Sequence, residues 1–144
     1  MDKDLRNLML VVLAIVGLLI YRASHPSATF AVDGNDAAWD EAVKLDRDAG
    51  QPAVVLFTAD WCPTCRALHA DVLSRLDVQQ ELMEHYFFYT VDLTNPSPQV
   101  QAHANEFGVK YIPMLIRFDK NGNETARANY LDADDLIAWL KAGE

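Results

Sequence analysis

Apolar and polar positions along most of this chain repeat with the periods of strands and helices. Short runs rich in valine, phenylalanine and tyrosine, at 53–57 and 87–91, have the length and the side chains of buried strands. A third strand is expected at 111–118. The residues 119–122 are a strong hairpin signal, and they join it to a fourth strand at 124–128.

Segments with a helical spacing of apolar residues lie between these strands. Polar caps, proline and glycine mark their ends, and Ser97 with Pro98 is the clearest start. The expected helices cover 35–49, Cys62 to about Arg75, 78–85 capped by Asp77, 97–107, and 134–141 capped by Asp132. Strands that alternate with helices and then end in a hairpin predict an α/β domain. We expect parallel crossovers plus one antiparallel edge, in a mixed sheet of four to five strands flanked by helices.

An unbroken apolar run from Leu8 to Ile20 precedes this domain. At about 1.5 Å per residue it spans roughly 20 Å, less than the hydrocarbon core of about 30 Å. That length suits the apolar region of a cleaved signal peptide as well as a membrane anchor. An anchor is favoured because Leu5 and Tyr21 extend the run and the segment 22–26 is a poor cleavage site.

We therefore expect one N-terminal hydrophobic helix in a membrane anchor at 1–22, then a tether at 23–32 and one domain at 33–144. Under either interpretation of the apolar run, the domain is exported from the cytoplasm. Lys3 and Arg6 favour an N-terminus on the inner side of the membrane. The expected protein is single-pass and monomeric.

The balance of charge is acidic, with 21 Asp and Glu against 12 Lys and Arg and a formal net charge of −9. Nucleic-acid binding needs a basic face, so this class of function is excluded. The acidity by itself identifies no partner.

The chain contains two cysteines, Cys62 and Cys65, spaced Cys-x-x-Cys where the first strand meets a helix. Unpaired N–H groups and the helix dipole favour a thiolate there, and the thiolate is the attacking species. The second cysteine lies one turn further on and can resolve a mixed disulfide. A bridge closing so small a loop stabilises a fold very little, and a closed zinc site needs four ligands. The spacing therefore indicates redox chemistry.

The residues 59–65 (Ala-Asp-Trp-Cys-Pro-Thr-Cys), followed about fifty residues later by 111–113 (Tyr-Ile-Pro), resemble the thioredoxin superfamily. The segments 91–94 and 118–122 are most similar to the C-terminal thioredoxin-like domain of DsbD-type thiol:disulfide interchange proteins. Those domains work as reductants outside the inner membrane of Gram-negative bacteria. The resemblance implies a thioredoxin-like fold, a bacterial periplasmic setting, protein thiols and disulfides as partners, and an upstream redox partner. It implies no cofactor beyond the Cys62–Cys65 disulfide.

The resemblance also implies a role for each matching residue. Cys62 is the exposed nucleophile, and Cys65 is the resolving thiol. Pro113, after Ile112, is the cis proline whose loop lies beside the sulfurs and pairs with a bound substrate backbone. Trp61 shields the site.

One position departs from the family pattern. The family commonly carries a buried acid six residues before the first cysteine, and Leu56 stands there instead. Asp60 and His69 are the candidates for tuning the cysteine pKa values in its place. His69 follows Cys62 by seven residues and Cys65 by four, so the three share a helical face.

Other functions remain open from the sequence. Cys62, Cys65 and His69 offer soft ligands suited to Cu(I), which defines a metal-delivery module as one alternative. A thiol oxidant and a binding protein without turnover are two others. The interpretation that explains most residues is a membrane-anchored thiol:disulfide oxidoreductase that reduces disulfides of partner proteins.

Overall fold

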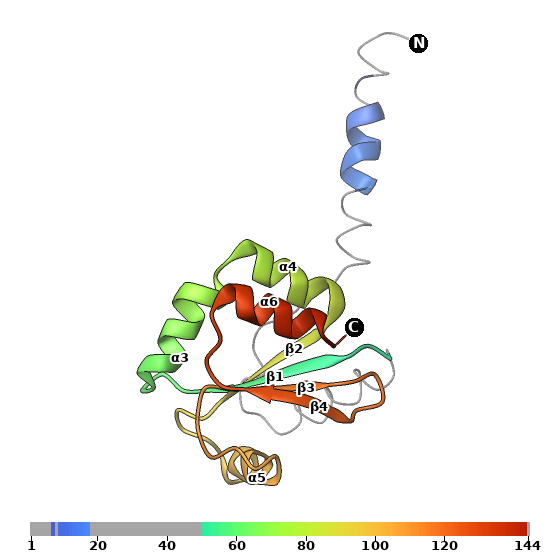
Figure 1. The fold of residues 1–144 in the computed structure, drawn as a ribbon. Helices are drawn as coiled ribbons and strands as arrows, with labels where there is room; N and C mark the ends of the chain where they lie inside the picture. Colours follow the sequence, from blue (N-terminus) through green and yellow to red (C-terminus); the bar gives the residue numbers. More distant parts are fainter. Residues whose placement is uncertain (1–6, 8, 18–49, 144) are drawn as a thin grey trace.

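The computed structural model describes residues 7, 9–17 and 50–143. From residue 50 onward, one four-stranded sheet carries helices on both faces (Figure 1), so the expected α/β class with a mixed sheet is confirmed. The elements in chain order are β1 (Ala53–Thr58), α3 (Pro63–Ala67), the π-helix η1 (Leu68–Leu73), α4 (Leu76–His85), β2 (Phe87–Asp92), α5 (Pro98–Glu106), β3 (Met114–Phe118), β4 (Glu124–Ala128) and α6 (Ala133–Lys141).

The strand order is β2-β1-β3-β4. β1 runs parallel to β2 and antiparallel to β3, and β3 runs antiparallel to β4. The expectation of parallel crossovers with one antiparallel edge is therefore wrong for β3. After α5 the chain enters β3 at the end of the sheet where β1 leaves it, since Met114 pairs with Phe57. An alternation of strands and helices does not specify at which end the chain returns.

Every residue of β1 is buried, because helices cover both faces of the central strand. Val54 and Leu56 face the cluster formed with η1, α4 and α6. Val55 and Phe57 face the opposite cluster, which α5 covers. In Figure 1, α4 and α6 lie above the sheet and α5 lies below it.

The helix expected from Cys62 to about Arg75 differs from the structure in its second half. The α-helical part ends at Ala67, and the chain continues as the π-helix η1. Leu68, Val72 and Leu73 are all buried, at spacings of four and five residues. A π-helix turn holds more than four residues, so this spacing places all three on one face.

Helix caps agree with local sequence signals in two of three places. Ser97 accepts a hydrogen bond from the backbone N–H of Val100, and Asp132 accepts one from Asp135. The expectation that Asp77 caps a helix from 78 is wrong, because α4 starts at Leu76 with Arg75 as its cap residue. Asp77 lies in the first turn, where the hydrogen bond from Arg75 lowers the pKa of its carboxyl group.

Expectations for the N-terminal part of the chain and for the third strand have different outcomes. The helix expected at 35–49 and the tether at 23–32 lie outside the described residues. Residues 9–17 are helical, with large apolar side chains 44–59% exposed. The strand expected from Tyr111 begins at Met114, because the residues before it form the loop of Pro113.

Arg117 on β3 is a buried cation, only 7% exposed. Its guanidinium donates to the Thr125 hydroxyl at 3.1 Å and to the backbone carbonyl of Trp139, and it stacks on the Trp139 ring at 4.8 Å. Trp139 lies in the last turn of α6, where unpaired carbonyls and the helix dipole favour a positive charge. The Arg117 side chain thus anchors the end of α6 to the sheet.

Replacing Arg117 with methionine should lower the free energy of unfolding by about 2 kcal/mol, because two partly buried acceptors lose a charged donor. Urea denaturation of both proteins measures the change. The matched control is Arg127→Met on β4, where the ion pair with Glu124 is more exposed than Arg117 and worth less than about 1 kcal/mol. Equal losses in the two variants would contradict an anchoring role for Arg117.

Candidate functional site

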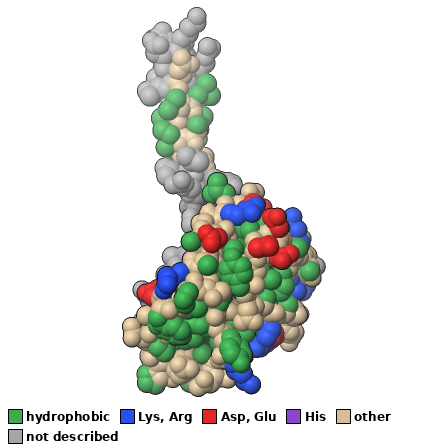
Figure 2. Space-filling view, turned by 60° about the vertical axis from the view of Figure 1, so that its left-hand side comes forward, with side chains coloured by type: hydrophobic (Ala, Val, Ile, Leu, Met, Phe, Trp, Pro, Cys, Tyr) green, Lys and Arg blue, Asp and Glu red, His purple; other side chains and the backbone are tan. Residues whose placement is uncertain are grey.

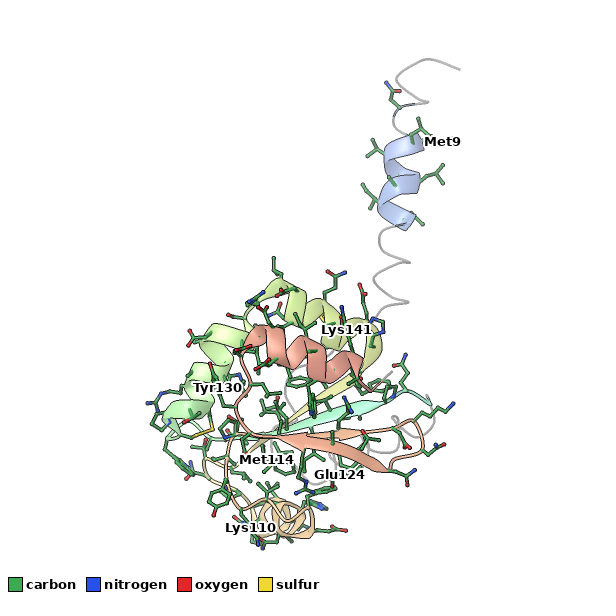
Figure 3. All side chains as sticks on the ribbon, in the orientation of Figure 1. Met9, Lys110, Met114, Glu124, Tyr130 and Lys141 are labelled. Atoms are coloured by element: carbon green, nitrogen blue, oxygen red, sulfur yellow. A yellow bond between two sulfur atoms is a disulfide. The ribbon has the colours of Figure 1, made fainter. Side chains whose placement is uncertain are left out.

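The two cysteines form a disulfide at the N-terminal end of α3, with their Cα atoms 5.2 Å apart (yellow bond in Figure 3). Cys62 is the cap residue of α3, and Pro63 occupies the first helical turn, where a missing N–H costs nothing. The backbone N–H of Cys65 donates to Cys62 Sγ at 3.1 Å. The first sulfur therefore lies where a helix start stabilises negative charge.

Both cysteines are buried in the disulfide, and Cys62 is slightly less buried than Cys65. Cys62 is 5% exposed and Cys65 is 0% exposed. Both pack with Ala59, and the partly buried Leu93 and Ile112 complete this cluster. Because only Cys62 retains exposed surface, it is the sulfur that an incoming disulfide can reach first.

The loop before β3 lies against the disulfide. The Ile112–Pro113 peptide bond is cis, as the resemblance implies. The Ile112 carbonyl lies 3.7 Å from Cys62 Sγ. Asn129, in the loop that follows β4, donates from its side chain to the Pro113 carbonyl at 3.0 Å. These contacts bring two loops that are distant in the sequence together beside the reactive sulfur.

A second set of contacts holds the segment that precedes Cys62. The Asp92 carboxylate accepts hydrogen bonds from the backbone N–H and the hydroxyl of Thr94. The Thr94 hydroxyl in turn accepts one from the backbone N–H of Asp60 at 2.8 Å. Arg66 donates to the Asp60 carbonyl at 2.6 Å. Asp60 thus contributes through its backbone to positioning Trp61 and Cys62.

His69 lies in η1, one turn after Cys65. Its Nε2 lies 3.4 Å from the hydroxyl of Thr58, the last residue of β1. The ring lines a cavity of about 300 Å³ between η1, α4 and β2, with Leu73, Ser74, Gln79, Phe88 and Thr90.

Within residues 7, 9–17 and 50–143, no three His, Cys, Asp or Glu side chains group so as to hold a metal ion. Cys62, Cys65 and His69 therefore do not group as a three-ligand set in this disulfide form, and the Cu(I) alternative stays a prediction.

Aromatic side chains are exposed on the loops around the disulfide. Trp61 is 63% exposed, Tyr111 is 74% exposed and Tyr130 is 39% exposed. Figure 2 turns the α3 end of the molecule forward and shows hydrophobic side chains spread over its lower half, with acidic ones gathered in its upper part. Trp61, which precedes Cys62 in the chain, is thus exposed, and its role in shielding the site stays a prediction.

A family model for a thioredoxin-like domain matches residues 39–144. The chain belongs to the thioredoxin-like family. It is 34% identical over 108 residues to the thiol:disulfide interchange protein DsbD of Neisseria meningitidis serogroup B, covering 73% of this chain and 17% of that protein. It is 32% identical over 127 residues to the thioredoxin-like protein HCF164, chloroplastic, of Oryza sativa subsp. japonica, covering 85% of this chain and 45% of that protein.

Solved structures agree with these relatives. The reduced C-terminal domain of Neisseria meningitidis DsbD superimposes with a TM-score of 0.67 at 25% identity, over 77% of this chain and 98% of that domain. The resemblance to thioredoxin-like domains of the DsbD type is therefore confirmed. The thioredoxin-like chain spans less than half the length of the curated relatives compared above.

The sequence pointed to the cysteines, Trp61 and the loop of Pro113, and the structure brings these residues together. Sequence reasoning assigned no role to Thr58, Asp92, Thr94 or Asn129. The spacing of Asp92 and Thr94 is an available signal, since aspartate often accepts hydrogen bonds from the residue two positions on. Asn129 carries no comparable signal, because its partner is sixteen residues away.

Replacing Thr94 with valine should lower the free energy of unfolding by about 1 kcal/mol, because the bridge between Asp92 and the Asp60 N–H is lost. The same variant should also change the alkylation rate of reduced Cys62, since the preceding segment is no longer held. Denaturation and iodoacetamide kinetics measure the two effects. Thr94→Ser keeps the hydroxyl and should restore both. A serine variant no closer to the unsubstituted protein than the valine variant would count against the bridge.

Proposed function

We propose that this protein is a thiol:disulfide oxidoreductase that reduces disulfides of partner proteins. The observation that carries the proposal is the Cys62–Cys65 disulfide at the start of α3, with Cys62 Sγ accepting the Cys65 N–H. Relatives over most of this chain are named thiol:disulfide interchange proteins, which matches this class of enzyme. The reaction needs no cofactor other than the cysteine pair.

The reaction proceeds in two exchanges. The thiolate of Cys62 attacks one sulfur of the partner's disulfide, the partner's S–S bond breaks, and a mixed disulfide forms. The thiolate of Cys65 then attacks Cys62 Sγ, the mixed disulfide breaks, and the partner leaves with two thiols. The partner gains two electrons and the cysteine pair loses two. A separate donor must reduce the pair again.

The protein partner has a surface to dock on. Trp61 and Tyr111 expose aromatic area beside the disulfide, and the Ile112 carbonyl lies next to Cys62 Sγ. Ile112 and Pro113 thus shape the site, as the resemblance implies. Disulfides in accessible polypeptide segments fit a site of this kind, and a monomer suffices for the reaction.

The proposed setting is the periplasmic side of an inner membrane, with the chain anchored by residues 5–21. The apolar run and the resemblance to DsbD-type domains support this setting. The described helix at 9–17 exposes its apolar side chains, as a helix in lipid does. Among the helices that the structure describes, none has both the length and the apolar character to cross a membrane.

The reduction potential of Cys62–Cys65, measured by equilibration with glutathione, should lie near −270 mV, the value of a reducing thioredoxin. A value near −120 mV marks a thiol oxidant and would overturn the direction proposed here.

Cys62→Ser should abolish disulfide reduction, because no nucleophile remains at the accessible position. Cys65→Ser should retain the first exchange and accumulate the mixed disulfide.

Mass spectrometry of the protein purified from membranes should find the N-terminus retained, and alkaline carbonate should fail to extract it. Leu13→Arg should release the protein, because a charged residue in the centre of a span costs about 3 kcal/mol of insertion free energy. Lys120→Arg, in the hairpin between β3 and β4, is the control and should stay membrane-bound. A mature protein lacking the apolar run would identify a cleaved signal peptide instead.

A further inference from the structure

The resolving thiol is enclosed where its proton has no direct route to water. Cys65 is fully buried, and its cluster consists of Cys62, Ala59, Leu93 and Ile112. Once Cys62 is bonded in the mixed disulfide, none of these side chains can take up a proton. The side of β1 that faces η1 carries Val54 and Leu56 in the core. A thiol must nevertheless lose its proton before it can attack a disulfide. Some nearby group must take that proton.

His69 is the titratable side chain placed to do this. It follows Cys65 by four residues, one turn further along the segment formed by α3 and η1, and its ring meets Thr58, the chain neighbour of Ala59 in the Cys65 cluster. The His69 ring is exposed and lines the cavity of about 300 Å³, which gives it access to water. Its Nε2 is held 3.4 Å from the Thr58 hydroxyl at the end of β1.

Resting on the proposed function, we propose that His69 carries the proton between the Cys65 thiol and solvent, and that Thr58 is the residue that positions its ring. In this arrangement Nε2–H donates to the Thr58 hydroxyl oxygen, and Nδ1 is the base. The cavity is the path by which the proton reaches water.

The Cys65 thiol gives its proton to neutral His69, leaving a thiolate and an imidazolium. The thiolate attacks Cys62 Sγ of the mixed disulfide, the Cys62–Cys65 bond forms, and the bond to the partner's sulfur breaks. The partner leaves as a thiolate, and His69 passes its proton to it or to water through the cavity.

The charges that face His69 are few. The other residues lining the cavity, from η1, α4 and β2, carry no titratable group. On its own helical segment, Arg66 and Asp71 are exposed, and Arg66 donates to the Asp60 carbonyl. At the end of β2, Asp92 is exposed and is bonded to Thr94. β1 contributes only the Thr58 hydroxyl to the surroundings of the His69 ring.

The test uses the reduced full chain in detergent and the aromatic disulfide DTNB. Attack by Cys62 releases one nitrothiobenzoate anion, and resolution by Cys65 releases a second. The anion leaves without needing a proton, so the second release reports removal of the proton from Cys65. His69→Gln should slow the second release by about 10²-fold, the scale of general-base catalysis, and leave the first release unchanged.

Three further readouts separate a proton carrier from a structural role. The pH profile of the second release should change in His69→Gln. Added imidazole should accelerate the second release in His69→Ala by entering the vacated site. Thr58→Val should also slow it, whereas Thr58→Ser, which keeps the hydroxyl, should restore it.

His103→Gln, on α5 across the sheet, is the matched control and should change neither release. If the unsubstituted protein releases only one anion, Cys65 does not resolve and the proposed function itself fails. If two are released and His69→Gln retains the rate and the pH profile of the second, the role of His69 is overturned while the proposed function stands.

Discussion

Burial of β1 on both faces is the constraint on which the rest of the structure depends. Val54 and Leu56 face one cluster and Val55 and Phe57 face the other, so the strand cannot shift by one residue without exchanging the two sets. Thr58 therefore ends the strand at one defined place. The segment 59–61 then carries the chain directly to the start of α3, and the position of Cys62 follows from the packing of the core.

The elements with strong local signals could be predicted from the sequence. The strand at 53–57, the cap and proline at Ser97 and Pro98, and the hairpin at 119–122 each depend on residues close together in the chain. The direction of β3 and the π-helix η1 could not be predicted in this way. Both depend on which face of the sheet the intervening residues cover, and that is decided by packing between distant elements.

The same distinction between local signals and long-range contacts holds for the site. The cysteine spacing and the helix start are local, and the sequence alone was sufficient to predict their chemistry. The contacts that position the cysteines are long-range: Thr94 reaches the Asp60 backbone over 34 residues, and the Ile112 carbonyl reaches Cys62 over 50. A resemblance to a known family supplied the loop of Pro113. It said nothing about Thr94, because hydrogen bonds to backbone groups leave only a weak pattern in the sequence.

The electrostatics of Cys62 bear on the direction of electron flow. Each donor to the Cys62 thiolate stabilises the reduced pair and so makes the dithiol a weaker reductant. The structure directs the Cys65 N–H to this sulfur, whereas the Arg66 guanidinium on the same helix donates to the Asp60 carbonyl. The Arg66 guanidinium therefore holds the loop before Cys62 in place. The Cys62 sulfur thus receives a backbone donor at a helix start but not the Arg66 guanidinium, an arrangement that agrees with the electron-donating direction proposed above.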